Sequence, residues 1–98
     1  MRVGVVTRAE DFPEARKPSY RLTIDFGELG TRRSVAALKS EYSPGELEGT
    51  QVVCVFNLPP RRIAGVSSEV LVLAATESDG RLRLLRPDPR AQLGSIVT

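Results

Sequence analysis

The segment YRLTIDF, residues 20–26, alternates apolar and polar residues without an error and is followed by Gly27. Successive side chains of a β-strand point to opposite faces of a sheet, so this period of two predicts a half-buried strand that ends at the glycine. The apolar pattern of the chain keeps this period rather than the 3.6-residue period of a helix, which predicts an all-β fold.

The apolar pattern predicts several other strands. Residues 3–7 form a shorter one that contains Gly4, where a bulge or a close backbone approach is expected. Residues 32–37 form a weaker third strand. Residues 51–58 (QVVCVFNL) and 69–76 (EVLVLAAT) are nearly continuous apolar runs, which are typical of strands covered on both sides.

The sequence predicts one helix start between the third and fourth of these strands. The sequence SPGE at 43–46 offers an N-cap serine, a proline at the first helical position and a capping-box glutamate, and Gly49 limits the helix to about one turn. Five short strands with a small helix after the third predict a five-stranded OB-fold Greek-key barrel, as a single domain over 1–98. An SH3-like barrel fits the same pattern.

Composition excludes several kinds of chemistry. The chain has 98 residues, no histidine and one cysteine, Cys54. Histidine-based triads, Cys/His zinc sites and internal disulfides are therefore excluded, and no cofactor or metal site is expected. Cys54 lies within VVCVF and is expected to act as a small buried hydrophobe. A chain this short hides only roughly 60–68% of its unfolded surface, so dimerisation would help its thin core.

The formal net charge is +2, from 14 basic and 12 acidic residues, and twelve of the basic residues are arginine. The guanidinium fork suits phosphates and stacked bases, although a genome rich in arginine codons explains the same bias. The apolar run at 3–6 is too short for a signal peptide, and no run approaches the ~18 residues of a membrane span. A cytoplasmic protein without membrane insertion is expected.

Two arginine pairs are candidate nucleic-acid contacts. Arg32 and Arg33 precede Ser34 on the third strand, and alternation sends at least one of the pair outward, on a face where OB-folds bind nucleic acid. Arg61 and Arg62 lie in NLPPRRIAG at 57–65, which is predicted to be a proline-stiffened loop before a strand. Such arginines could position phosphates, and ordinary solvation of both pairs is the alternative.

Two further places border the same predicted face. In the loop at 12–20, Arg16 and Lys17 add charge, while Tyr20 could stack on a base or, being in phase with the apolar positions of its strand, lie in the core. Ser68 and Glu69 open the last long strand and could read a base edge by hydrogen bonds; a structural ion pair is the alternative for Glu69.

With the strands in place, the chain resembles the CsaA family, which is built around a tRNA-binding OB domain that also occurs at the C-terminus of many methionyl-tRNA synthetases. The residues that carry the resemblance are RVG at 2–4, EDFPEARKPSYRLTIDFG at 10–27, Tyr42, PGELEG at 44–49, Asn57, IAG at 63–65, SEVLVLAA at 68–75, LLRPD at 84–88 and Gly94.

The resemblance implies a five-stranded OB barrel, a homodimer and tRNA binding that depends on structure more than on sequence. It also implies an alternative, because CsaA members are described as export-related chaperones that bind unfolded or pre-secretory polypeptides. Motif matching puts the RNA-binding face on Lys17, Arg32, Arg33, Ser34, Asn57, Arg61, Arg62, Ser68 and Glu69.

The chain departs from the family pattern in two places. Family members usually carry a short N-terminal helix before the RVG that here stands at 2–4, and this helix helps the family dimer. Its loss should show at the dimer interface, and a misplaced start codon is the alternative. The third strand usually reads Ser-Ser-Ala-Gln-Ile-Thr, where this chain has SVAALK at 34–39. Recognition of RNA by hydrogen bonds should weaken at this strand, and apolar contact with the ligand should increase.

From the residues and the resemblance together, the expectation is a tRNA-binding protein that is not an enzyme.

Overall fold

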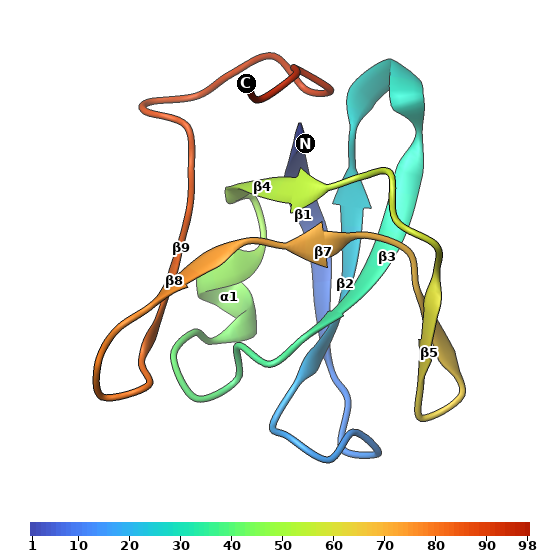
Figure 1. Cartoon of the computed structure of the whole chain (residues 1–98), viewed down its shortest axis with the longest axis vertical. Helices are drawn as coiled ribbons and strands as arrows, with labels where there is room; N and C mark the ends of the chain where they lie inside the picture. The colour runs from blue at the N-terminus through green and yellow to red at the C-terminus, as the bar shows by residue number, and fades with distance from the viewer.

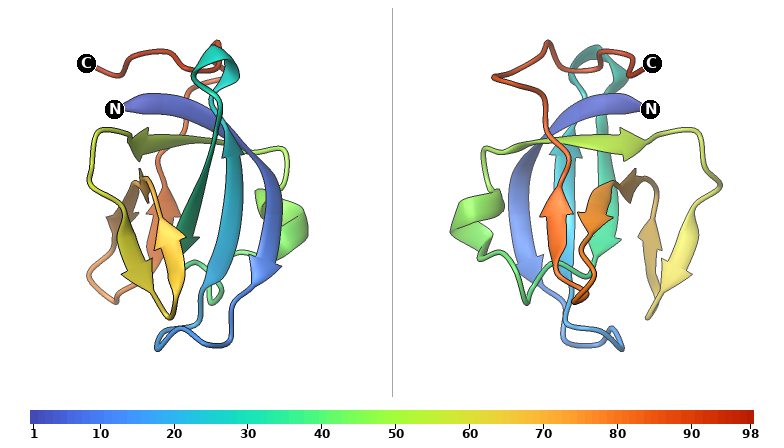
Figure 2. Two further views of the ribbon diagram at one scale, coloured as in Figure 1. Left: turned by 90° about the vertical axis from the view of Figure 1, so that its right-hand side faces the viewer. Right: turned by 60° about the vertical axis from the view of Figure 1, so that its left-hand side comes forward.

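A five-stranded antiparallel sheet organises the computed structural model, which covers residues 1–98 (Figure 1). Its strands are hydrogen-bonded in the order β3-β2-β1-β4-β7. They are β1 (Arg2–Asp11), β2 (Tyr20–Asp25), β3 (Thr31–Ala36), β4 (Gln51–Val55) and β7 (Leu71–Val72). The two edge strands, β3 and β7, come near each other, so that the curled sheet is nearly closed into a barrel (Figure 2). This is the predicted all-β, OB-like barrel.

Alternation in β2 is confirmed by burial. Tyr20, Leu22 and Ile24 are buried, and the residues between them are half-buried. Their side chains lie in one core cluster with Phe26, Val6 and other apolar residues of the barrel interior. The sequence pattern alone therefore predicts which face of this strand lies in the interior.

Gly4 lies where two segments approach closely. A Cβ atom at this position would lie 2.6 Å from Ile24 Cγ2 and 2.8 Å from Phe26 Cε1, so only glycine fits without a shift of the core. The predicted close approach is thus confirmed. The bulge of β1 lies further along, because the register against β2 shifts between Val6 and Arg8.

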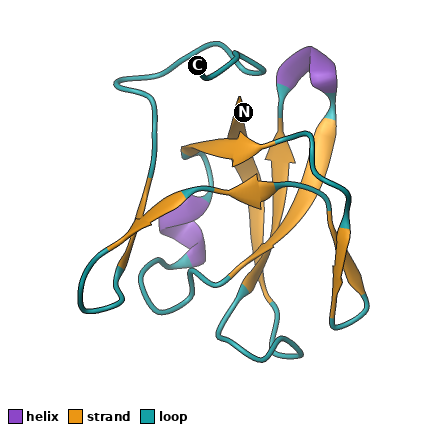
Figure 3. Cartoon of the chain, viewed as in Figure 1, coloured by secondary structure: helices purple, strands orange, loops and turns teal.

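The predicted one-turn helix is present as α1 (Pro44–Leu47), one of the two purple elements in Figure 3. The Ser43 side chain accepts a hydrogen bond from the Glu46 amide, and the Glu46 carboxylate accepts one from the Ser43 amide, which completes the capping box. Leu47 is fully buried in the core cluster. A second short element, the 3-10 helix η1 (Gly27–Leu29), was not predicted.

The second half of the chain differs from the predicted strands. The run at 51–58 is a strand only to Val55. The run at 69–76 is broken after Val72, because β8 (Ala74–Thr76) leaves the main sheet and pairs with β9 (Leu82–Leu84). Residues 61–68, which include part of the predicted loop, form a hairpin of β5 (Arg61–Ile63) and β6 (Val66–Ser68). Continuous apolar character did not distinguish one long strand from two short ones.

The C-terminal segment lies across one end of the barrel, beside the start of β1 (Figure 1). The Val3 amide donates to the Ser95 carbonyl at 3.0 Å, and the Gly94 amide donates to the Val3 carbonyl at 2.8 Å. These bonds hold the two ends of the chain together. No helix in the structure has the length and apolar character that a membrane span requires.

Candidate nucleic-acid interface

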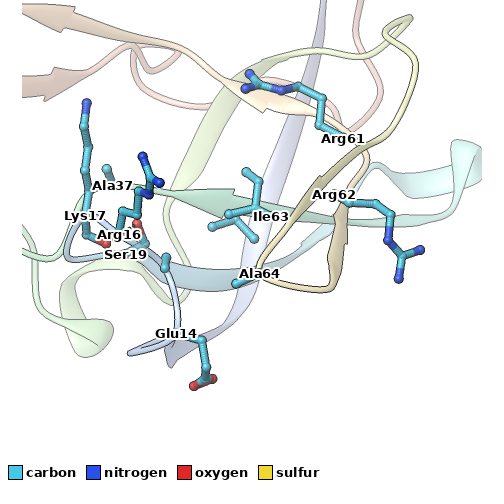
Figure 4. Close-up of a pocket in the computed structure, with 11 residues that line it drawn as sticks. Glu14, Arg16, Lys17, Ser19, Ala37, Arg61, Arg62, Ile63 and Ala64 are labelled. Atoms are coloured by element: carbon cyan, nitrogen blue, oxygen red, sulfur yellow. Dashed lines mark hydrogen bonds between the residues drawn. The ribbon is translucent and has the colours of Figure 1, made fainter.

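A groove of about 560 Å³ lies over β3, between the loop that joins β1 to β2 and the β5–β6 hairpin; we call it the basic groove (Figure 4). Val35 and Ala37 of the third strand and its extension form part of its lining. They alternate with Ser34, which is buried, so they lie on the outer face of the barrel. The groove is lined by Glu14, Ala15, Arg16, Lys17, Ser19, Val35, Ala37, Arg61, Arg62, Ile63 and Ala64.

Four cations and one carboxylate line the basic groove. Arg16 and Lys17 come from the β1–β2 loop and Arg61 and Arg62 from the hairpin, so the positive charge stands on both walls (Figure 4). All four side chains are exposed and none is in an intramolecular ion pair; the ion pairs of the chain involve other residues. Unpaired cations that face each other across a groove create a positive potential that attracts a polyanion.

The hairpin wall is built by a two-residue turn. Ile63 pairs with Val66, and the two residues between them, Ala64 and Gly65, have positive φ angles of 48° and 85°. Positive φ at both central residues is the mark of a type I′ turn, whose twist matches that of paired strands. Because side chains alternate along a strand, Arg61 and Ile63 share one side of β5 while Arg62 turns to the other, where it donates to the Gly65 carbonyl at 3.3 Å.

The arginine pair of β3 is split between two faces, as alternation predicted. The Arg32 guanidinium lies 4.9 Å from the centre of the Phe56 ring and donates to the carbonyls of Leu29 and Thr31. Arg32 is half-buried and does not line the basic groove. Arg33 is exposed on the same outer face as Val35, next to the groove along the strand. Of the other predicted contacts, Asn57 is exposed and lies outside the groove.

The three remaining predicted contacts bind the protein's own main chain. Ser34 Oγ donates to the Val70 carbonyl at 2.8 Å, and Ser68 Oγ accepts from the Val35 amide at 3.0 Å. The Glu69 carboxylate accepts from the Arg33 amide at 2.8 Å, and no ion pair involves it. All three bonds join β3 to the segment before β7. These side chains therefore close the barrel at its open seam, where no strand ladder spans the gap.

The burial of Tyr20 and Cys54 decides what these two residues do. Tyr20 lies in the core, and its hydroxyl donates to the Tyr42 carbonyl at 2.8 Å, so the stacking alternative is wrong. Cys54 is fully buried, and desolvation raises the pKa of its thiol to about 12, which leaves it protonated and unreactive in the folded chain.

Sequence reasoning missed most of the apolar lining of the groove. Ile63 and Ala64 were assigned to a charged loop, and Ala15 carried no pattern of its own. The dipeptide Ala64-Gly65 between residues 61–63 and 66–68 was the available signal, because glycine with a small residue between two short segments favours a tight hairpin.

The sequence of residues 1–96 matches the family described as "Putative tRNA binding domain". The chain belongs to this family. A similar chaperone structure, CsaA from Bacillus anthracis, is 47% identical with a TM-score of 0.93 and aligns over 99% of this chain and 88% of that one. CsaA from Picrophilus torridus is 41% identical with a TM-score of 0.88, over 98% of this chain and 89% of that one. The resemblance to the CsaA family is thereby confirmed.

The same family domain occurs within larger proteins. Methionine–tRNA ligase of Porphyromonas gingivalis is 42% identical over 97 residues, and that of Methanocaldococcus jannaschii is 38% identical over the same length. The alignments cover 99% of this chain but only 14% and 15% of the two ligases. The chain is thus similar to one small part of these enzymes.

Proposed function

We propose that this domain binds tRNA through the basic groove and the adjoining Arg33, and that it catalyses no reaction. The observation that carries the proposal is the set of four exposed, unpaired cations along one groove, in a chain of the tRNA-binding domain family: Arg16 and Lys17 lie across the groove from Arg61, and Arg62 lies on the outer side of the hairpin. Arginine and lysine at such positions contact phosphates, which orient a nucleic acid without reading its sequence. Recognition would then depend on the shape and backbone of tRNA, in the cytoplasm where tRNA is abundant.

Two features favour binding over catalysis. The single cysteine is buried with its pKa raised to about 12, so it is not available as a nucleophile. The basic groove holds no histidine and a single carboxylate, Glu14, whose side chain points away from Ile63 in Figure 4. The groove therefore offers cations and apolar surface but no evident general base.

The proposal is tested by tRNA binding of charge-removing variants. In fluorescence anisotropy with total tRNA at low salt, Arg61→Ala/Arg62→Ala is expected to lower the affinity at least about tenfold, because two charge-assisted contacts are lost. The matched control is Arg81→Ala/Arg83→Ala at the β8–β9 hairpin, which removes the same charge away from the groove. Equal losses in both variants would show that only net charge matters, and the groove assignment would then be wrong.

A second candidate function, binding of unfolded polypeptides, is favoured by one further surface. An apolar groove of about 230 Å³ runs along the seam between β3 and β7; we call it the seam groove. It is lined by Val35, Ala36, Ala37, Leu38, Leu71, Val72, Ala74 and Leu82. It shares Val35 and Ala37 with the basic groove, so an extended polypeptide with apolar and acidic residues could contact both.

Leu71 separates the two candidate functions. Its side chain is 46% exposed and lines the seam groove but not the basic groove. If polypeptides bind there, Leu71→Asp should abolish the suppression of aggregation of an unfolded client while tRNA affinity changes little. Leu85→Asp is the matched control, because Leu85 is 44% exposed and lines neither groove. Failure of the wild-type protein to suppress aggregation removes this candidate.

We also propose a homodimer that covers apolar residues near the two ends of the chain. Met1, Leu29 and Ile96 are exposed, and Leu29 and Ile96 line one groove. A second copy of the chain is the partner that the resemblance to CsaA implies, and covering these residues would compensate for a thin core. Sedimentation equilibrium at micromolar concentration should give twice the chain mass of 10.7 kDa. A mass near that of one chain would overturn the dimer.

A further inference from the structure

The lining of the basic groove combines apolar side chains with cations. Five of the eleven lining residues are apolar: Ala15, Val35, Ala37, Ile63 and Ala64. Figure 4 shows Ile63 between the cations of the two walls and Ala37 beside Arg16 and Lys17. None of the lining residues is aromatic. The groove is thus an apolar slot with positively charged rims, and the rims alone account for attraction to phosphates.

The apolar slot has no complement on an intact duplex. Duplex RNA presents phosphates, riboses and 2′-hydroxyls on its outside, while the apolar faces of its bases are stacked inside the helix. Burying Ile63 and Val35 against phosphates would gain nothing from the hydrophobic effect. An unstacked base, in contrast, offers two flat apolar faces, and its flanking phosphates lie on either side. The volume of about 560 Å³ is within the range of roughly 300–1,000 Å³ typical of small-ligand sites.

We propose that the basic groove takes an unpaired, unstacked nucleotide, with the base against Ile63, Val35 and Ala37 and the flanking phosphates at the cations of the two walls. This inference rests on the proposed function and names the part of the RNA that the groove recognises. The site therefore selects loops, bulges and single-stranded ends over paired stems. The apolar side chains of the slot take the place of aromatic side chains in contacting the base face.

The groove also indicates low base selectivity. Ser19 is the one uncharged polar side chain that lines it, and its hydroxyl is buried and donates to the Lys17 carbonyl at 2.9 Å. No other neutral donor or acceptor side chain faces the slot to read a base edge. Single-stranded homopolymers of different bases are therefore expected to bind with affinities within about tenfold of one another, as with other stacking-based sites.

The test compares three labelled RNAs of equal length by fluorescence anisotropy at one salt concentration. They are a single strand, the same strand with abasic sites, and a blunt duplex. The wild-type protein should bind the single strand at least about tenfold better than the abasic strand, which keeps every phosphate but lacks bases to contact. The duplex should also bind more weakly than the single strand, despite its higher charge density.

A variant pair locates the base contact. Ile63→Thr keeps a β-branched side chain on β5 but removes apolar contact, and Val66→Thr is the control, because Val66 is the cross-strand partner of Ile63 and lies outside the groove. Ile63→Thr should lower the affinity for the single strand about fivefold. It should leave the affinity for the abasic strand unchanged, because a contact between Ile63 and the base is already absent there. Val66→Thr should leave both affinities unchanged.

Three results would overturn the inference. If the abasic strand and the single strand bind equally, the groove reads only the backbone, and the proposed tRNA binding still stands. If Ile63→Thr weakens binding of an unfolded polypeptide but not of RNA, the slot belongs to a peptide. If total tRNA itself does not bind at low salt, the proposed function fails and the inference fails with it.

Discussion

Replacing Ser34 by alanine tests whether this residue closes the barrel or contacts RNA. Ser34 is 2% exposed, and its hydroxyl donates to the carbonyl of Val70, which is also buried. The variant Ser34→Ala leaves that carbonyl without its side-chain donor. An unsatisfied buried polar group costs about 1–3 kcal/mol of unfolding free energy. With a slope near ~1 kcal/mol/M in urea, the midpoint should fall by about 1–3 M.

The assay for Ser34→Ala is urea denaturation followed by far-ultraviolet circular dichroism, because the chain has no tryptophan. Protein concentration is held fixed, since any dimer makes apparent stability depend on it. Ser67→Ala is the control: Ser67 is half-buried on β6 without a side-chain hydrogen bond, so its stability should change by less than ~0.5 kcal/mol. Unchanged stability of Ser34→Ala together with lost tRNA affinity would refute the closure role and indicate a direct RNA contact.

Three further predictions concern the core, the thiol and the helix cap. Gly4→Ala should destabilise the fold by at least ~1–3 kcal/mol through overpacking, whereas Gly45→Ala, whose Cβ meets nothing within 4 Å, should not; denaturant titration compares them. Cys54 should resist a thiol reagent at pH 8 until the chain unfolds, because its pKa is raised to about 12; fast labelling of the native protein would contradict its burial. Hydrogen bonds from Ser43 lower the pKa of Glu46 below its usual 4.5, so the ionised carboxylate stabilises the folded chain. The wild-type protein should therefore be more stable than Glu46→Gln at neutral pH, and this difference should be lost as the pH falls through the lowered pKa. Thermal melts at several pH values measure it. A difference that grows in acid would contradict the cap.

Local patterns predicted the elements whose own residues carry a clear structural signal. Strict alternation fixed β2 and its buried face, and SPGE fixed α1 with its capping box. Gly4 was expected at a close approach, and its place against Ile24 and Phe26 confirms it. In β2 and α1, the residues that carry the signal also make the stabilising contacts. Position 4 is glycine because a larger side chain would not fit there.

Non-local contacts decided what the patterns did not predict. Glu69 and Ser68 have the residue types of a binding site, but their partners are main-chain amides of β3, more than thirty residues away in sequence. Arg32 likewise resembles a free cation until Phe56 and nearby carbonyls are in place around it. Only the closed barrel brings Arg16 and Lys17 opposite Arg61, across the apolar side chains that line the groove.

The most direct test of the central claim is a salt titration of tRNA affinity. The wild-type protein is compared with a variant in which Arg16, Lys17, Arg61 and Arg62 are alanine; Arg32 is left in place because Phe56 holds it. The logarithm of the association constant falls linearly with the logarithm of salt concentration, with a slope of about 0.7–0.9 per phosphate contacted. The slope of the variant should be shallower by up to ~3–4, with much weaker binding at low salt. A wild-type affinity that does not change with salt, or two parallel lines of equal affinity, would contradict tRNA binding through the basic groove.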